Sequence, residues 1–149
     1  MVLWDGSCMV HEIFSLEKIT RLKAKSPEAK FIAHPECEEN VLKLADFIGS
    51  TTALLNFSKK DAAKTFIVGT ETGILHQMEK ESPEKTFIPA PPTNNCACND
   101  CPHMKLNTLE KLYICLRDEK PEITMATDLI ERSVKPIRRM LELSAQYGL

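Results

Sequence analysis

Three cysteines lie close together in the segment CACNDCPHM, residues 96–104. Cys98 and Cys101 form a Cys-x-x-Cys pair, which is typical of zinc sites, of iron–sulfur ligation and of redox-active dithiols. Cys96 and His103 could complete a set of four ligands, but the segment is too short to wrap a tetrahedral ion comfortably. The alternative is that only one of these thiols binds a metal and that its partners lie far away in the sequence.

The elements that must position these thiols alternate between strands and helices. Compact apolar runs predict strands at 2–4, 30–35, 64–71 and 85–91. Apolar residues at helical spacing predict helices at 15–27, 36–49, 50–62, 72–81, 107–120 and 124–146, with Pro136 kinking or dividing the last. This alternation is typical of βαβ units, so we predict an α/β fold with a parallel sheet covered by helices.

Reactive and polar residues follow each predicted strand. Because ligands bind beyond the carboxyl ends of parallel strands, we expect these residues to share one edge of the sheet. The residues expected there are Cys8 (with His11 three residues on), His34, Glu36, Thr70 and Cys101. Glu36 could equally be a first-turn carboxylate favoured by the helix dipole.

Ser50 and Thr51 begin a predicted helix. Free backbone N–H groups and hydroxyls at that position suit a carboxylate or phosphate, although the two residues could also be only a helix cap.

Composition excludes several other classes of protein. The chain has 149 residues, 43% of them hydrophobic and 27% charged, with a net charge of -2. That balance gives no field to attract nucleic acid or an anionic membrane surface. No apolar run approaches a membrane span, and the N-terminus lacks the pattern of a signal peptide. We therefore expect a cytoplasmic protein whose thiols are metal ligands or reactive groups rather than disulfides.

Five motifs together resemble the quinolinate synthase family. They are GSCMVH (6–11), IAHPEC (32–37), IGSTTALL (48–55), FIVGTETGILH (66–76) and CNDCPHMKLNTL (98–109). They occur in the family's order and spacing, and the C-terminal LIERSVKPIRRMLELS is also similar. The resemblance implies condensation of iminoaspartate (iminosuccinate) with dihydroxyacetone phosphate to quinolinate, with loss of phosphate and water, in NAD biosynthesis.

The resemblance also implies an architecture and a cofactor. The family has three α-β-α sandwich domains around a pseudo-threefold axis. One cysteine from each domain holds a [4Fe–4S] cluster, and the fourth iron stays open to water or substrate. On this sequence the ligands are Cys8 and Cys101, whereas Cys98 is a neighbour and Cys37 is structural.

The family's substrate contacts match residues of this chain one by one. The strand-end His-Pro-Glu corresponds to His34, Pro35 and Glu36, and the helix-start Ser-Thr corresponds to Ser50 and Thr51. Glu36 is the expected acid/base, and His34 the expected group that orients the phosphate-bearing substrate.

The chain is about half the family's usual length. By resemblance, residues 1–12 are the end of the preceding domain, 13–106 the third α/β domain and 107–149 the C-terminal helices. We expect this chain alone to be inactive and to need the N-terminal half in trans. The competing hypothesis is a non-catalytic zinc or dithiol module built on Cys96, Cys98 and Cys101.

Overall fold

The computed structural model describes residues 6–93 and 99–148. They divide into two compact units, Met1–Leu106 and Asn107–Leu149, and each is described by itself. The predicted strand at 2–4, together with Cys96 and Cys98, lies outside the described residues.

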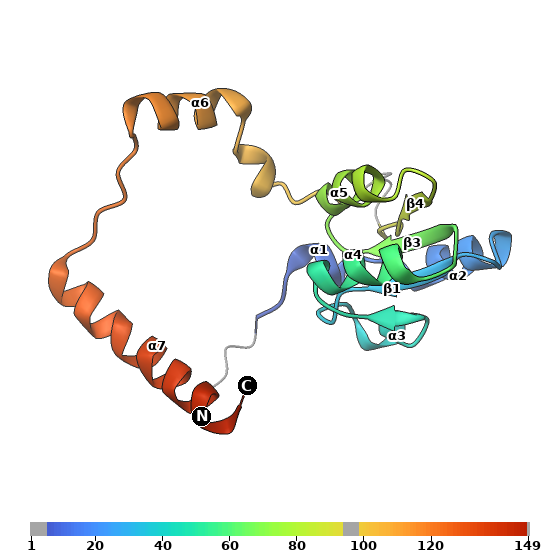
Figure 1. The fold of residues 1–149 in the computed structure, drawn as a ribbon, viewed down its shortest axis with the longest axis horizontal. Helices are drawn as coiled ribbons and strands as arrows, with labels where there is room; N and C mark the ends of the chain where they lie inside the picture. Colours follow the sequence, from blue (N-terminus) through green and yellow to red (C-terminus); the bar gives the residue numbers. More distant parts are fainter. Residues whose placement is uncertain (1–5, 94–98, 149) are drawn as a thin grey trace. The chain divides into compact units, whose positions relative to one another are not determined.

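A four-stranded parallel sheet forms the centre of the first unit (Figure 1). Its strands, in the order β2-β1-β3-β4, are β2 (Phe47–Ile48), β1 (Lys30–Ala33), β3 (Thr65–Gly69) and β4 (Thr86–Pro89). The register pairs Ala33 with both Ile48 and Gly69, and Val68 with Pro89. All four strands therefore end at the same edge of the sheet, as the sequence predicts for parallel strands.

Helices cover both faces of this sheet. The α2 helix (Leu16–Lys25) and the α3 helix (Glu39–Leu42) lie on one face, and α4 (Thr51–Lys60) and α5 (Gly73–Glu81) on the other. Neighbouring strand residues alternate between two apolar cores, because successive side chains of a strand point to opposite faces. Phe31 packs in the core with Ile19, whereas Ile32 packs in the core with Leu54. The predicted α/β sandwich with a parallel sheet is confirmed.

The predicted helix over 36–49 is wrong in its second half. Only Glu39–Leu42 forms a helix, and Phe47–Ile48 forms the edge strand β2. The backbone of Asp46 donates to the Phe31 carbonyl at 2.7 Å, and its carboxylate accepts from the Phe31 amide at 2.7 Å. Pairing with β1 therefore overrides the helical spacing of the apolar residues in this segment.

The second unit consists of two helices, α6 (Leu109–Asp118) and α7 (Thr127–Tyr147). Thr108 caps α6 by accepting a hydrogen bond from the Lys111 amide at 3.2 Å. Pro136 lies inside α7 without dividing it. Among the described helices, none is long and apolar enough to cross a membrane.

Candidate metal and substrate site

Two reactive side chains come from one short helix beside the sheet. Cys8 is the N-cap of α1 (Met9–Glu12), and its carbonyl accepts hydrogen bonds from the amides of His11 at 2.9 Å and Glu12 at 3.2 Å. Across this turn, the Cys8 thiol lies within 4.8 Å of a nitrogen of the His11 imidazole. Cys8 is partly exposed, whereas His11 is buried.

His11 is held at both ring nitrogens. Its Nδ1 lies 3.0 Å from Glu36 Oε2, and its Nε2 lies 3.1 Å from the hydroxyl of Thr70. An ionised carboxylate can only accept a hydrogen bond, so the Nδ1 proton points at Glu36 and neutral His11 accepts from Thr70 at Nε2. The ring therefore has a fixed orientation between the segments that follow β1 and β3.

His34 stacks on His11. The ring centroids are 4.3 Å apart with an interplanar angle of 9°, and His34 Nδ1 accepts from the Glu36 amide at 3.3 Å. Burial, and to a smaller extent nearby His11, lower the pKa of His34 below its ordinary value, while Glu36 acts in the opposite direction. With Nδ1 occupied as an acceptor, neutral His34 carries its proton on Nε2.

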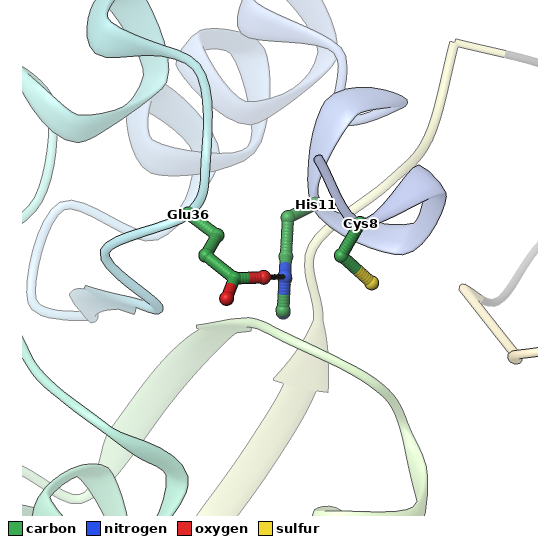
Figure 2. Close-up of side chains that lie close together, drawn as sticks. All are labelled: Cys8, His11 and Glu36. Carbon is green, nitrogen blue, oxygen red and sulfur yellow. Dashed lines mark hydrogen bonds and ion pairs between the residues drawn. The ribbon is translucent and has the colours of Figure 1, made fainter. Parts of the chain in front are cut away.

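Cys8, His11 and Glu36 form a compact set of possible metal ligands (Figure 2). One donor atom from each residue lies within 4.8 Å of the others. Thiolate, imidazole and carboxylate are the donor types that zinc and other first-row divalent metals take in proteins. Glu36 approaches from the segment after β1, on the opposite side of His11 from Cys8 (Figure 2).

The second thiol expected to bind metal, Cys101, lies on a loop tied to this edge. The buried side-chain amide of Asn99 donates to the carbonyl of Val10 in α1. The Cys101 amide donates to Glu71 Oε1 at 3.3 Å, just after β3. The Cys101 loop is therefore anchored both to the helix that follows Cys8 and to the segment that follows Thr70.

Cys37 is not a ligand in this arrangement. It is buried in the apolar core, and its thiol donates to the Gly69 carbonyl at 3.4 Å. Burial raises the pKa of Cys37 to about 12, so the thiol is protonated at neutral pH.

The remaining predicted contacts follow β1 and β2 at the same edge. The hydroxyl of Ser50 accepts from the Ala53 amide at 3.3 Å and so caps α4. Thr51 is the first residue of that helix, and both residues are exposed. Pro35 is exposed as well. The hydroxyl-bearing residues Ser50 and Thr51 and the ring of Pro35 are therefore accessible to the solvent.

Two hollows in the first unit are lined by other residues. One, of about 280 Å³, is lined by Lys18, Arg21, Leu22, Lys25, Pro89 and Pro91. The other, of about 490 Å³, is lined by Phe47, Ala53, Asn56, Phe57, Lys60 and Asp61. Neither hollow is lined by a predicted site residue.

The sequence analysis expected Thr70 at this edge and noted His11 after Cys8, but it gave neither residue a role, and it did not include Asn99. A signal for His11 is present in the Cys-x-x-His spacing from Cys8, which is a common spacing of metal ligands. Thr70 stands at a strand end, where the sheet topology already predicts site residues. No sequence pattern marks Asn99, because its role depends on a carbonyl 89 positions away.

A parallel α/β sheet with thiol, imidazole and carboxylate groups at its carboxyl edge is typical of an enzyme domain that binds its ligand there. The family model described as quinolinate synthetase A protein (NadA) matches residues 1–142. This chain belongs to the quinolinate synthase family.

Curated quinolinate synthases are similar to this chain over nearly its whole length. That of Microcystis aeruginosa is 66% identical over 144 residues, which cover 97% of this chain and 45% of the relative. Those of Thermosynechococcus vestitus and Chloroherpeton thalassium are 63% and 59% identical over 145 residues, covering 97% of this chain and 46% and 45% of the relatives. The chain therefore spans a little under half the length of these relatives.

Proposed function

We propose that this chain supplies part of the active site of a quinolinate synthase. The reaction condenses iminoaspartate with dihydroxyacetone phosphate to quinolinate and releases phosphate and water. The proposal depends mainly on one observation: residues from several family motifs contact one another at the same edge of the sheet. His11 joins Glu36 and Thr70 there, His34 stacks on it, and the Cys8 helix adjoins.

The proposal assigns a [4Fe–4S] cluster to the two thiols of this chain that match the family's pattern, Cys8 and Cys101. Cys8 and Cys101 are both partly exposed, and the loop of Cys101 is hydrogen-bonded to the helix of Cys8 through Asn99. Cys37 is buried and protonated, so it does not compete for iron. When bound, the cluster would supply an open iron that acts as a Lewis acid on a substrate oxygen.

Glu36 is the residue we assign to proton transfer. Its side chain is 55% exposed, and His11 holds the Oε2 atom by a hydrogen bond. Oε1 is then the atom that exchanges a proton with substrate, and the His11–Thr70 contact keeps the carboxylate in place. Loss of water from the condensation intermediates needs such a group.

His34 and the start of α4 are the groups we assign to anion binding. A neutral His34 with its proton on Nε2 can donate to a phosphate or carboxylate oxygen. Thr51 offers a hydroxyl and a free backbone amide in the first turn of α4, and Ser50 precedes it. Pro35 fixes the chain between His34 and Glu36, because its ring restricts the backbone.

Two thiolates are fewer than the three that the family's cluster takes. We expect this chain alone to bind the cluster poorly and to make no quinolinate. The remaining part of the family's chain, supplied in trans, should restore both. The experiment is anaerobic reconstitution with iron and sulfide, followed by a quinolinate assay, with and without that part. Quinolinate formation by this chain alone would contradict the proposal.

Substitution of single cysteines tests the ligand assignment in the reconstituted complex. Cys101→Ser should abolish the cluster's visible absorption, whereas Cys98→Ser should leave it intact. The reverse result would move the iron ligand to Cys98. A bound metal that is unaffected by Cys8→Ala would instead support a separate zinc or dithiol module on Cys96, Cys98 and Cys101.

A further inference from the structure

We propose that, in the chain without an iron–sulfur cluster, Cys8, His11 and Glu36 form a binding site for a single thiophilic divalent cation, such as Zn²⁺ or Co²⁺. One donor atom of each residue lies within 4.8 Å of the other two. Tetrahedral coordination at ligand distances of about 2.0–2.3 Å places donors roughly 3.3–3.8 Å apart. A shift of at most roughly 1.0–1.5 Å in any pair of donors is therefore enough to close the site.

The residue that must move is free to do so. Glu36 is the most exposed of the three, with 55% of its side chain accessible, whereas 9% of the His11 side chain is accessible. The Glu36 carboxylate already faces His11 Nδ1 at 3.0 Å. A cation between them replaces the Nδ1 proton, and the carboxylate needs only a rotation of its side chain to remain in contact.

His11 is prepared for coordination by its second nitrogen. When Nδ1 binds a cation, the proton moves to Nε2, which then donates to the Thr70 hydroxyl at its present distance of 3.1 Å. A hydroxyl both accepts and donates, so Thr70 satisfies either tautomer. An outer partner that fixes the ring of a ligating histidine is a recurrent feature of metal sites. Thr70 is 2% exposed and the His11 ring stacks on His34, so the imidazole cannot turn away.

The donor set selects the class of cation. One thiolate and one imidazole favour zinc, cobalt and ferrous iron over magnesium or calcium, which take oxygen ligands. Three protein ligands leave a fourth position for water or for an oxygen of a small anion. Because Cys8 is also the cysteine assigned to the cluster, the single cation and the cluster exclude one another at this thiol.

The experiment is anaerobic titration of the purified chain with Co²⁺. The background variant carries Cys96→Ser and Cys98→Ser, which removes the competing thiols of that segment. We expect one Co²⁺ per chain, with a thiolate-to-cobalt charge-transfer band and the intense visible bands of tetrahedral geometry. Zn²⁺ should displace it at one equivalent, since zinc binds such sites more tightly than cobalt.

Single substitutions in that background assign the ligands. Cys8→Ser should abolish the charge-transfer band. Glu36→Gln, at an exposed position, should keep the fold. Loss of a residue that only supports a ligand typically weakens metal binding roughly 10- to 100-fold, so loss of the direct ligand Glu36 should weaken Co²⁺ binding by at least as much. Thr70→Val should weaken it by roughly 10-fold. The matched control Cys115→Ser, in α6, should change nothing.

Three results would overturn the proposal. One is no Co²⁺ binding by a chain whose circular dichroism shows it folded. Another is binding that is undiminished by Glu36→Gln, which would leave the carboxylate without a role. The third is binding that Cys101→Ser abolishes together with Cys8→Ser, which would identify a two-thiol site instead. None of these readouts depends on quinolinate synthesis, so failure here and failure of the proposed function are distinguishable.

Discussion

The imidazole of His11 and the hydroxyl of Thr70, 59 positions apart in the sequence, are joined by a buried hydrogen bond of 3.1 Å. This contact links helix α1 to the end of the central strand β3. Because Glu36 occupies the other ring nitrogen, the same imidazole connects the ends of two neighbouring strands. The relationship makes His11 the central residue of the candidate site.

Thr70→Val should destabilise the first unit by about 1–3 kcal/mol, because it leaves the buried His11 Nε2 without a hydrogen-bond partner. Urea unfolding followed by far-ultraviolet circular dichroism measures the change. Thr70→Ser keeps the hydroxyl and serves as the control, with a smaller loss expected from the missing methyl group. Equal losses for the two variants would mean that packing, and not the hydrogen bond, determines the effect.

The His34 imidazole should titrate below its ordinary pKa of 6.5, since burial and nearby His11 both oppose its positive charge. Glu36 raises this pKa, so Glu36→Gln should lower the midpoint further. The check is an NMR titration of the ring protons, assigned by comparison with a His34→Gln variant.

The same shift fixes the sign of a stability effect. The unfolded chain takes up the His34 proton near pH 6.5, before the folded chain does. The contribution of neutral His34 to the unfolding free energy is therefore fully present above pH 6.5. It is lost as the pH falls through the folded-state pKa of His34. An unfolding free energy less sensitive to acid in wild type than in His34→Gln would contradict this assignment.

Cys37 should resist alkylation in the folded chain. Its pKa is raised to about 12 by burial, and the thiolate is the species that reacts with iodoacetamide. Mass spectrometry after treatment at mildly alkaline pH should find Cys115, which is exposed, modified and Cys37 intact. Addition of denaturant should make the two equally reactive. Rapid labelling of Cys37 without denaturant would show that the core around it opens.

Gly69→Ala should destabilise the chain by about 1–3 kcal/mol, because overpacking a close-packed core forces neighbours from their positions. A Cβ at Gly69 would meet the Phe31 ring at 3.0 and 3.1 Å and the Ala33 Cβ at 3.3 Å. In the double variant Gly69→Ala/Phe31→Leu, the smaller side chain should relieve the contact. The combined loss in urea unfolding should therefore be less than the sum of the two single losses. If the two losses in unfolding free energy simply added, the Phe31 ring would not be the cause of the strain in Gly69→Ala.

Much of the fold follows from local patterns. The runs KFIA and TFIVG, with their β-branched and aromatic residues and a proline or glycine close behind, predicted β1 and β3 near their observed bounds. Ser15 and Ser50 each accept a backbone hydrogen bond at the start of a predicted helix. These features depend on residues close in sequence, so a single sequence is enough to find them.

The edge strand β2 did not follow from such patterns. Val41, Leu44, Ala45 and Ile48 have helical spacing, but Phe47 and Ile48 pair with β1 instead. That pairing depends on the complementary bonds between Asp46 and Phe31, which lie 15 positions apart. Local propensity does not indicate which strand a segment pairs with, because that pairing depends on the tertiary fold.

The candidate site was predicted in outline only. The strand-end rule brought His34, Glu36 and Thr70 to one edge, and contacts of the structure join them there through His11. The rule could not indicate that His11 lies between the other two, because which ring meets which carboxylate depends on side-chain packing. The assignment of Cys8 and Cys101 to one iron centre stays a prediction.

Every strand of the sheet runs in the same direction, so the turns at its opposite end carry none of the candidate ligands. Those turns, residues 26–29, 61–64 and 82–85, precede β1, β3 and β4. A surface tether or an affinity tag inserted in one of these turns would attach the first unit through the amino-terminal edge of its sheet. In a chain immobilised in this way, the carboxyl edge of the sheet, with the candidate ligands, would face away from the support. It would then be open to metal ions, small anions or a complementary polypeptide.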